Sequence, residues 1–268
     1  MGAALIAATL TGLSTGLGAL PFLFVRELPR RVYDGILGLG AGLMLAAATL
    51  GLLTEALSGV RLAGGGFDGG RLAMVVAGFV VGVALAAAMD RLIPHRHASG
   101  HHQHLGHEPG HDHHDREPDA AEVWRGYALI GALTIHRVPE GLAIGAGFAG
   151  EHAHLGLLLA IAVGVQNACE GIVMAAPLRR GGISAGRGAL LVTLTGLATP
   201  LAALLGGALG GRAVTTMPFL LALAGGTLIY LTSNEIIPES HSHGNEGTAS
   251  SGVVAGFLFT MLLNALLP

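Results

Sequence analysis

The chain has 268 residues, of which 51% are hydrophobic and only 12% charged, and its mean hydropathy is +0.63. This composition excludes an ordinary soluble domain. The formal net charge of −3 carries no basic excess, so we expect no nucleic-acid partner. We therefore expect a polytopic membrane protein embedded in a lipid bilayer.

Apolar runs long enough to cross about 30 Å of hydrocarbon predict the membrane-spanning segments. Uncharged runs lie near residues 2–25, 35–54, 72–89, 187–211, 213–234 and 250–267. Two more runs, near 126–149 and 155–178, are interrupted by charged residues. Open sheets cannot satisfy their backbone in lipid, so all eight spans should be helical. The fold class we expect is an all-α membrane protein, with residues 1–268 forming a single transmembrane domain.

The arginines predict how the chain is oriented in the membrane. All fourteen basic residues are arginine, and with the N-terminus outside only Arg61, Arg71 and Arg212 fall in outer loops. By the positive-inside rule, this asymmetry places both termini outside a cytoplasmic (inner) membrane.

A histidine-rich loop, residues 95–122, connects the third and fourth spans and holds most of the fourteen histidines. It is polar and low in complexity, so we expect a cytoplasmic segment that is disordered without metal. Clustered imidazoles bind divalent cations, although a solvated loop that merely tolerates histidine is the alternative. The candidate capture residues, including two after the seventh span, are His101, His102, His104, His107, His111, His113, His114, His241 and His243.

The chemistry is concentrated in the fourth and fifth spans. His136 and Glu140 are four residues apart, and so are Gln166 and Glu170. At this spacing the members of each pair share a helix face. If the two faces meet, the four side chains form a nitrogen and oxygen pocket for one divalent cation. An ordinary interhelical hydrogen bond is the alternative for His136, but ionisable groups at bilayer depth cost about 2.5–3.5 kcal/mol each and generally serve a function.

Two other classes of protein lack their required residues. An intramembrane zinc hydrolase needs a general base beside its metal ligands, and no further carboxylate stands at helical spacing here. A primary pump needs a nucleotide-binding motif, which in its common form contains lysine, and the chain has none. We therefore expect a carrier that is not an enzyme.

The sequence His-Arg-Val-Pro-Glu-Gly at 136–141 resembles the His-Asn-x-Pro-Glu-Gly signature in the fourth helix of the ZIP family of zinc and iron permeases. The sequence Gln-Asn-Ala-Cys-Glu-Gly at 166–171 is similar to that family's fifth-helix signature. The resemblance implies import of Zn2+ toward the cytoplasm, with Fe2+, Mn2+, Co2+ or Cd2+ as other candidate substrates. It also implies a 3+2+3 helix arrangement with inverted repeats and an elevator-like motion of helices 1, 4, 5 and 6. A homodimer is compatible with this expectation.

The sequence departs from the family at a second metal position. Some bacterial members hold a second ion through an asparagine, an acidic residue and a glutamate, where this chain has Arg137, Asn167 and Thr199. A guanidinium is permanently cationic, so we expect Arg137 to replace that second ion and leave one metal site. The alternative is a transport-impaired metal sensor of the same fold.

Further polar residues are candidates for a cytoplasmic exit, or else for simple interfacial caps. They are Asp90, His95, Asn234, Glu235 and Glu239.

Overall fold

The computed structural model describes residues 2–58, 60–62, 66–92, 120–149, 153–210 and 217–266. Within these ranges every regular element is a helix, apart from one isolated bridge between Arg61 and Phe67, so the predicted all-helical class is confirmed. The elements are α1 (Gly2–Ala19), η1 (Leu20–Leu23), α2 (Arg30–Ala46), η2 (Ala47–Leu53), α3 (Thr54–Leu57), α4 (Gly69–Leu92), α5 (Ala120–Ala149), α6 (Ala153–Arg180), α7 (Ala185–Thr195), α8 (Ala198–Gly210), α9 (Met217–Leu231), η3 (Thr232–Ile236), α10 (Ile237–Ser240) and α11 (Glu246–Leu266). Consecutive elements join into eight long helical segments.

Seven of these segments, within the described ranges, are long and apolar enough to cross a membrane. The one predicted span that is not among these seven is the fourth along the chain, which is the 30-residue helix α5. Its polar turn of His136, Arg137 and Glu140 lowers its hydropathy. Several spans are longer than predicted; the second, for example, runs from Arg30 to Leu57. Hydropathy detects only the part of a helix in hydrocarbon, whereas helical hydrogen bonding continues into the interface.

The predicted end of the histidine-rich loop needs a correction. Residues 120–122 are helical because α5 begins at Ala120. Glu122 lies in the first turn of α5, where an acidic side chain favours a helix start, and it accepts a hydrogen bond from Arg180 Nε at 3.2 Å. Residues 95–119, with all the predicted capture histidines of the loop, lie outside the described residues.

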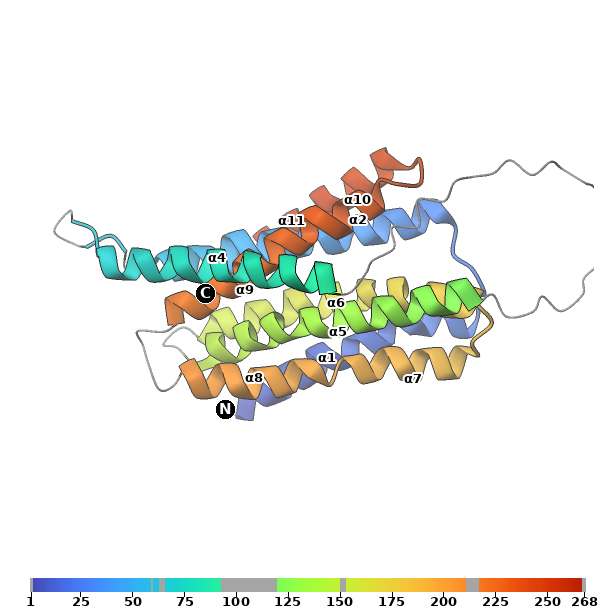
Figure 1. Ribbon diagram of the computed structural model, residues 1–268, viewed down its shortest axis with the longest axis horizontal. Coiled ribbons are helices and arrows are strands. Elements are labelled where there is room, and N and C mark those ends of the chain that lie inside the picture. Colours follow the sequence, from blue (N-terminus) through green and yellow to red (C-terminus); the bar gives the residue numbers. More distant parts are fainter. Residues whose placement is uncertain are drawn as a thin grey trace, which may run out of the picture.

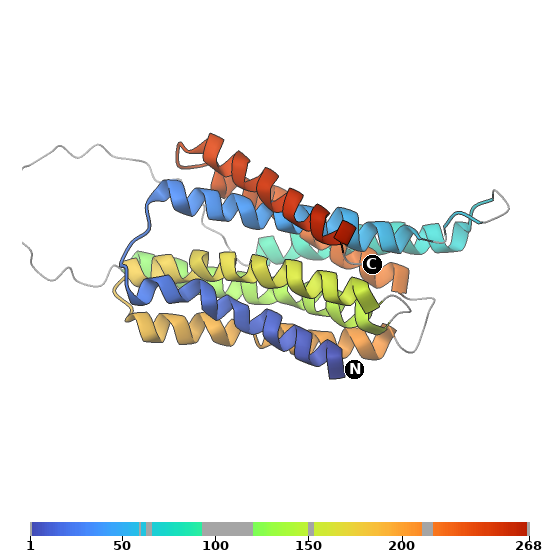
Figure 2. The ribbon, with the colours of Figure 1, turned by 180° about the vertical axis from the view of Figure 1, so that it is seen from behind.

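The helices pack in two groups, which Figures 1 and 2 show as two layers. In the first group, α1 packs on α6, α7 and α8, and α5 packs on α6 and α8. In the second group, α2 packs on α11, and α4 packs on α9. The groups meet mainly where α2 contacts α6 and where α5 contacts α9. Both chain ends lie at the same end of the bundle (Figure 1).

Among the glycines that the structure describes, close helix approach occurs within each group and not between the groups. A Cβ added at Gly18 of α1 would overlap the carbonyl oxygen of Ala168 on α6, and one added at Gly42 of α2 would overlap the carbonyl oxygen of Val253 on α11. Across the groups, a Cβ at Gly40 of α2 would lie 3.6 Å from the Cβ of Cys169 on α6, an ordinary contact. Backbones therefore touch inside each group, while this contact between the groups is made by a side chain.

This packing predicts opposite effects for two helical glycines. We expect Gly42→Ala to lower the thermal midpoint in detergent, because an overpacked core site costs about 1–3 kcal/mol. Gly131 of α5 has nothing within 4 Å of an added Cβ. Gly131→Ala is the matched control and should be neutral or raise the midpoint, because alanine gains about 1 kcal/mol of helix propensity. Equal destabilisation by both changes would contradict the close backbone contact at Gly42.

Candidate metal-binding site

The polar turns of α5 and α6 lie in the interior of the first group of helices. These two helices pack directly against each other. His136 and Glu140 on α5, and Gln166 and Glu170 on α6, are each no more than 5% exposed. All four predicted ligands are therefore buried inside the helix bundle, on the two helices α5 and α6 that pack against each other.

A hydrogen-bonded network joins three of the predicted ligands to Arg137. The side-chain amide of Gln166 donates to Glu140 Oε1 at 2.6 Å and to Glu170 Oε1 at 3.0 Å. Arg137 Nη2 donates to Glu170 Oε2 at 3.1 Å. We call Arg137, Glu140, Gln166 and Glu170 the midplane network. His136 is buried on the same helix, one turn before Glu140.

Several atoms of the midplane network make no hydrogen bond within the described structure. They include Glu140 Oε2 and Gln166 Oε1, which are acceptors, and Nε and Nη1 of Arg137, which are donors. Buried polar atoms without partners are costly, so sites that keep them generally have a use for them. The two oxygen atoms are the ligand type that a divalent cation requires. In the part of the chain that is described, no group of three His, Cys, Asp or Glu side chains is arranged to hold a metal ion. In this conformation, N–H donors occupy three of the four carboxylate oxygens.

Arg137, Asn167 and Thr199, which the family resemblance assigns to a second metal position, lie in three different environments. Arg137 is fully buried and belongs to the midplane network. Asn167 turns to α1, where its Nδ2 donates to the carbonyl oxygen of Thr11 at 2.9 Å. Thr199, at the start of α8, is fully buried, and its hydroxyl has no hydrogen-bond partner among the described residues. Thr11 was not predicted from the sequence, because a threonine in an apolar helix carries no signal of its own.

The predicted exit residues fall into two sets. Asn234 and Glu235 lie in η3, a π-helical turn of the seventh span, and Glu239 follows in α10. Asp90 lies in α4, but its side chain is outside the described part of the structure, as is the whole of His95. The structure therefore places only the exit candidates of the seventh span.

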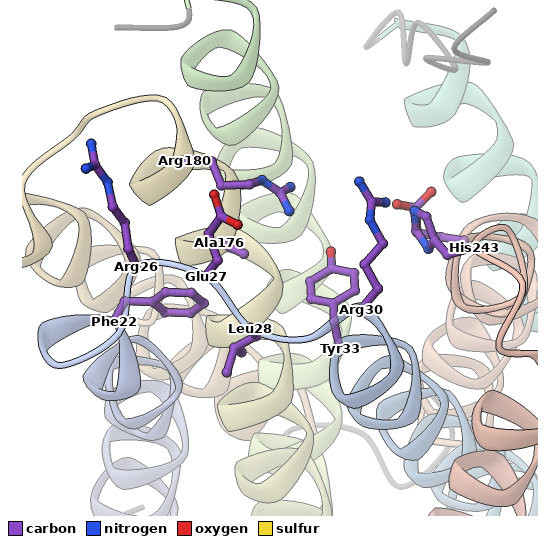
Figure 3. A pocket seen from close by; sticks show the side chains of 10 residues that line it. Phe22, Arg26, Glu27, Leu28, Arg30, Tyr33, Ala176, Arg180 and His243 are labelled. Atoms are coloured by element: carbon purple, nitrogen blue, oxygen red, sulfur yellow. The ribbon is translucent and has the colours of Figure 1, made fainter. Parts of the chain in front are cut away.

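One end of the bundle carries Arg26, Arg30, Arg31, Arg179 and Arg180, and we call it the arginine-rich end. A pocket opens there. Its lining comes from both groups of helices, and Figure 3 shows the residues that face it. The lining includes Phe22 and Arg180 from the first group and Tyr33, Glu239 and His243 from the second.

Beneath this pocket, a carboxylate holds the turn between α10 and α11. Asp34 of α2 is fully buried and lies 2.9 Å from His243 Nδ1 and 2.9 Å from Asn245 Nδ2. Neither Asp34 nor Asn245 was predicted from the sequence as a site residue. The available signal was an acidic residue within an otherwise apolar helix, which is generally functional or paired.

Comparisons with known proteins identify the family of the chain. A family model described as ZIP zinc transporter matches residues 87–264. The chain is 38% identical over 267 residues to zinc transporter GufA of Myxococcus xanthus, with 98% of each chain covered. It is 35% identical over 255 residues to zinc transporter ZIPB of Bordetella bronchiseptica, covering 95% of this chain and 78% of the relative. It is 30% identical over 321 residues to zinc transporter ZIP11 of Homo sapiens, covering 94% of this chain and 93% of the relative. The chain therefore belongs to the ZIP family of zinc transporters, which are multi-pass membrane proteins and not enzymes.

Proposed function

We propose that this protein imports Zn2+ into the cytoplasm by binding one ion at a time to His136, Glu140, Gln166 and Glu170. The observation that carries the proposal is the pairing of two buried carboxylates, Glu140 and Glu170, through the amide of Gln166. Two carboxylates this close and this deep are unfavourable without a cation or donors between them. The site therefore favours a positive ion.

The amide of Gln166 is the part of the midplane network that an ion must displace. Its N–H donors occupy one oxygen of each carboxylate, while its own Oε1 has no partner. A half turn of the amide releases both carboxylate oxygens and brings Oε1 to the same side. His136 adds an imidazole nitrogen from the preceding turn. This donor set of one nitrogen and several oxygens suits Zn2+ and also accommodates Fe2+, Mn2+, Co2+ or Cd2+.

Arg137 sets the charge of the site and argues for a single ion. Glu140 and Glu170 contribute −2 and the guanidinium contributes +1, so the empty network has a net charge of −1. One divalent ion changes this charge to +1. A second would raise it to +3 in a buried environment, which is strongly unfavourable. Arg137 lies on Glu170 where a second bridging cation would bind that carboxylate.

The packing of the helices supports an elevator-like exchange of access. The group formed by α1, α5, α6, α7 and α8 carries the midplane network, and glycine contacts join it tightly. Its contact with the second group includes ordinary side-chain packing at Gly40 and Cys169. We propose that the first group moves as one body against the second, in a 3+2+3 arrangement with inverted repeats and both termini outside. Metal leaving the site would then meet the histidine-rich loop.

A transport-impaired sensor of the same fold is the second candidate function. The ion pair between Arg137 and Glu170 favours it, because a guanidinium bound to a ligand carboxylate competes with the metal. Uptake measurements separate the two functions: a sensor binds zinc in the membrane site without moving it.

Zinc uptake into proteoliposomes should depend on Glu140. Glu140→Ala removes a direct ligand and is expected to lower the uptake rate by more than the 10–100-fold typical of changes to residues behind a metal ligand. Glu246→Ala, a change at an exposed acidic residue in the first turn of α11, is the control and should transport normally. Unchanged uptake by Glu140→Ala would refute the site, and absence of uptake in wild type would favour the sensor.

The number of ions in the membrane site follows from the charge of Arg137. Equilibrium dialysis should show that wild type binds one more Zn2+ per chain than the double variant Glu140→Ala, Glu170→Ala. The histidine-rich loop contributes equally to both proteins and cancels in the difference. A difference of two ions would show that Arg137 does not replace a cation.

Substitution of Arg137 should change zinc affinity through charge. Arg137→Asn leaves the site at −2, so we expect the Kd for Zn2+ to fall at least about tenfold, equivalent to 1.4 kcal/mol. Arg137→Lys retains the charge and should stay close to wild type. Weaker binding in Arg137→Asn than in Arg137→Lys would instead mean that the guanidinium positions Glu170.

A further inference from the structure

The pocket at the arginine-rich end lies at the boundary between the apolar spans and water. Four of the segments that are long and apolar enough to cross a membrane have an end there, at Leu23, Arg30, Arg180 and Ser240. Two large aromatic side chains are exposed at the same end, Phe24 directly after the first span and Trp124 in the second turn of α5. Exposed aromatic rings gather at the level of the lipid headgroups. The pocket is therefore at headgroup depth.

Two arginines in the pocket lining carry charge that the described part of the protein does not neutralise. Arg26 and Arg30 are exposed and take part in none of the ion pairs found among the described residues. Arg30 is also the first residue of α2, where a positive charge opposes the helix dipole. The lining holds three arginines against Glu27 and Glu239, a formal charge of +1, and Glu239 already has an interaction partner. The pocket therefore favours an anion over a cation.

Arginines from the two groups of helices converge on this pocket. Arg180 ends α6 in the first group, and Arg30 begins α2 in the second. Both side chains line the pocket, and Figure 3 shows the guanidinium of Arg180 extending toward that of Arg30, with the hydroxyl of Tyr33 below them in this view. Like charges repel unless an anion lies between them. A guanidinium presents a flat fork of N–H donors that matches phosphate oxygens, so one phosphate can contact both arginines.

An apolar surface adjoins the charged pocket. Leu23, Phe24 and Val25 are exposed directly before Arg26. In a bilayer such side chains lie against acyl chains, while a basic residue beside them attracts anionic headgroups. A small soluble anion gains nothing from these apolar side chains, whereas a phospholipid contacts both kinds of surface.

We propose that the pocket binds the headgroup of an anionic phospholipid, with Arg30 and Arg180 contacting its phosphate and Arg26 facing the same headgroup. The class of ligand follows from the charge of the lining, its depth and the adjoining apolar side chains. Because Arg30 and Arg180 belong to different groups of helices, the bound lipid joins the two groups at this end of the bundle. None of these residues belongs to the midplane network, so the inference does not rest on zinc transport.

The test is lipid binding by the intact chain in detergent, measured by native mass spectrometry with EDTA present. The probes are phosphatidylglycerol and phosphatidylcholine with identical acyl chains, which differ in net charge. We expect phosphatidylglycerol to bind at least about tenfold more tightly, because only this lipid leaves a net negative charge for the guanidinium groups. Equal affinity for the two lipids would overturn the proposal. Binding of inorganic phosphate as tight as that of phosphatidylglycerol would also overturn it and identify a site for a free anion.

The contact from the second group is tested at Arg30. Arg30→Gln should weaken phosphatidylglycerol binding about tenfold, the loss expected for one charge-assisted hydrogen bond. Arg187→Gln is the matched control, because Arg187 is exposed in α7 at the same end and does not line the pocket. An equal effect of the two changes would mean that binding depends only on the general charge of this end, which would overturn the proposal.

The contact from the first group is tested at Arg180. Arg180→Gln should weaken binding by a similar factor, but it also breaks the ion pair with Glu122, whose Oε2 lies 3.2 Å from Arg180 Nε. Glu122→Gln is the control, because it removes the same ion pair and keeps the guanidinium. We expect Glu122→Gln to bind phosphatidylglycerol at least as tightly as wild type. If it weakens binding as much as Arg180→Gln does, or if Arg180→Gln has no effect, the lipid does not join the two groups.

These measurements contain no zinc, so they fail or succeed independently of the proposed function. Lost uptake in proteoliposomes with normal phosphatidylglycerol binding would count against transport alone. Normal uptake without preferential binding of phosphatidylglycerol would overturn only the lipid site.

Discussion

The constraint on which the structure depends is the burial of two carboxylates on adjacent helices inside a membrane protein. Glu140 and Glu170 are each at most 5% exposed and share one amide donor, Gln166. Such a pair is tolerated only when positive charge or N–H donors lie between the two groups. Arg137 provides the charge and Gln166 provides the donors, so the chain's own side chains hold the two carboxylates together.

This constraint decides where α5 can lie. A helix with His136, Arg137 and Glu140 in its middle is too polar to face lipid, and it does not meet the apolarity expected of an isolated span. It becomes stable when α6 covers its polar turn and α8 and α9 pack on its other faces. Small residues allow this close enclosure, as where Gly145 of α5 meets the backbone of α8 at Ala203. The burial of the midplane network and the tight packing of the first group thus have one origin.

The helical class, and the proximity of Glu140, Gln166 and Glu170, were predictable because both depend on local spacing. Apolar runs indicate spans, and polar residues four apart indicate a shared face, as for Gln166 and Glu170. Long-range partners were not predictable. Asn167 was assigned to a metal position by its place in a motif, yet it donates to Thr11 on α1. His241 and His243 were grouped together, and only the fold shows that buried Asp34 lies behind one of them.

If the midplane network binds one ion as proposed, its net charge governs both the binding and the release of that ion. A carrier site must bind strongly enough to select a cation and weakly enough to let it go, and a net charge of −1 is a compromise between these needs. Without the guanidinium, the two carboxylates would hold a divalent ion more tightly in a buried environment.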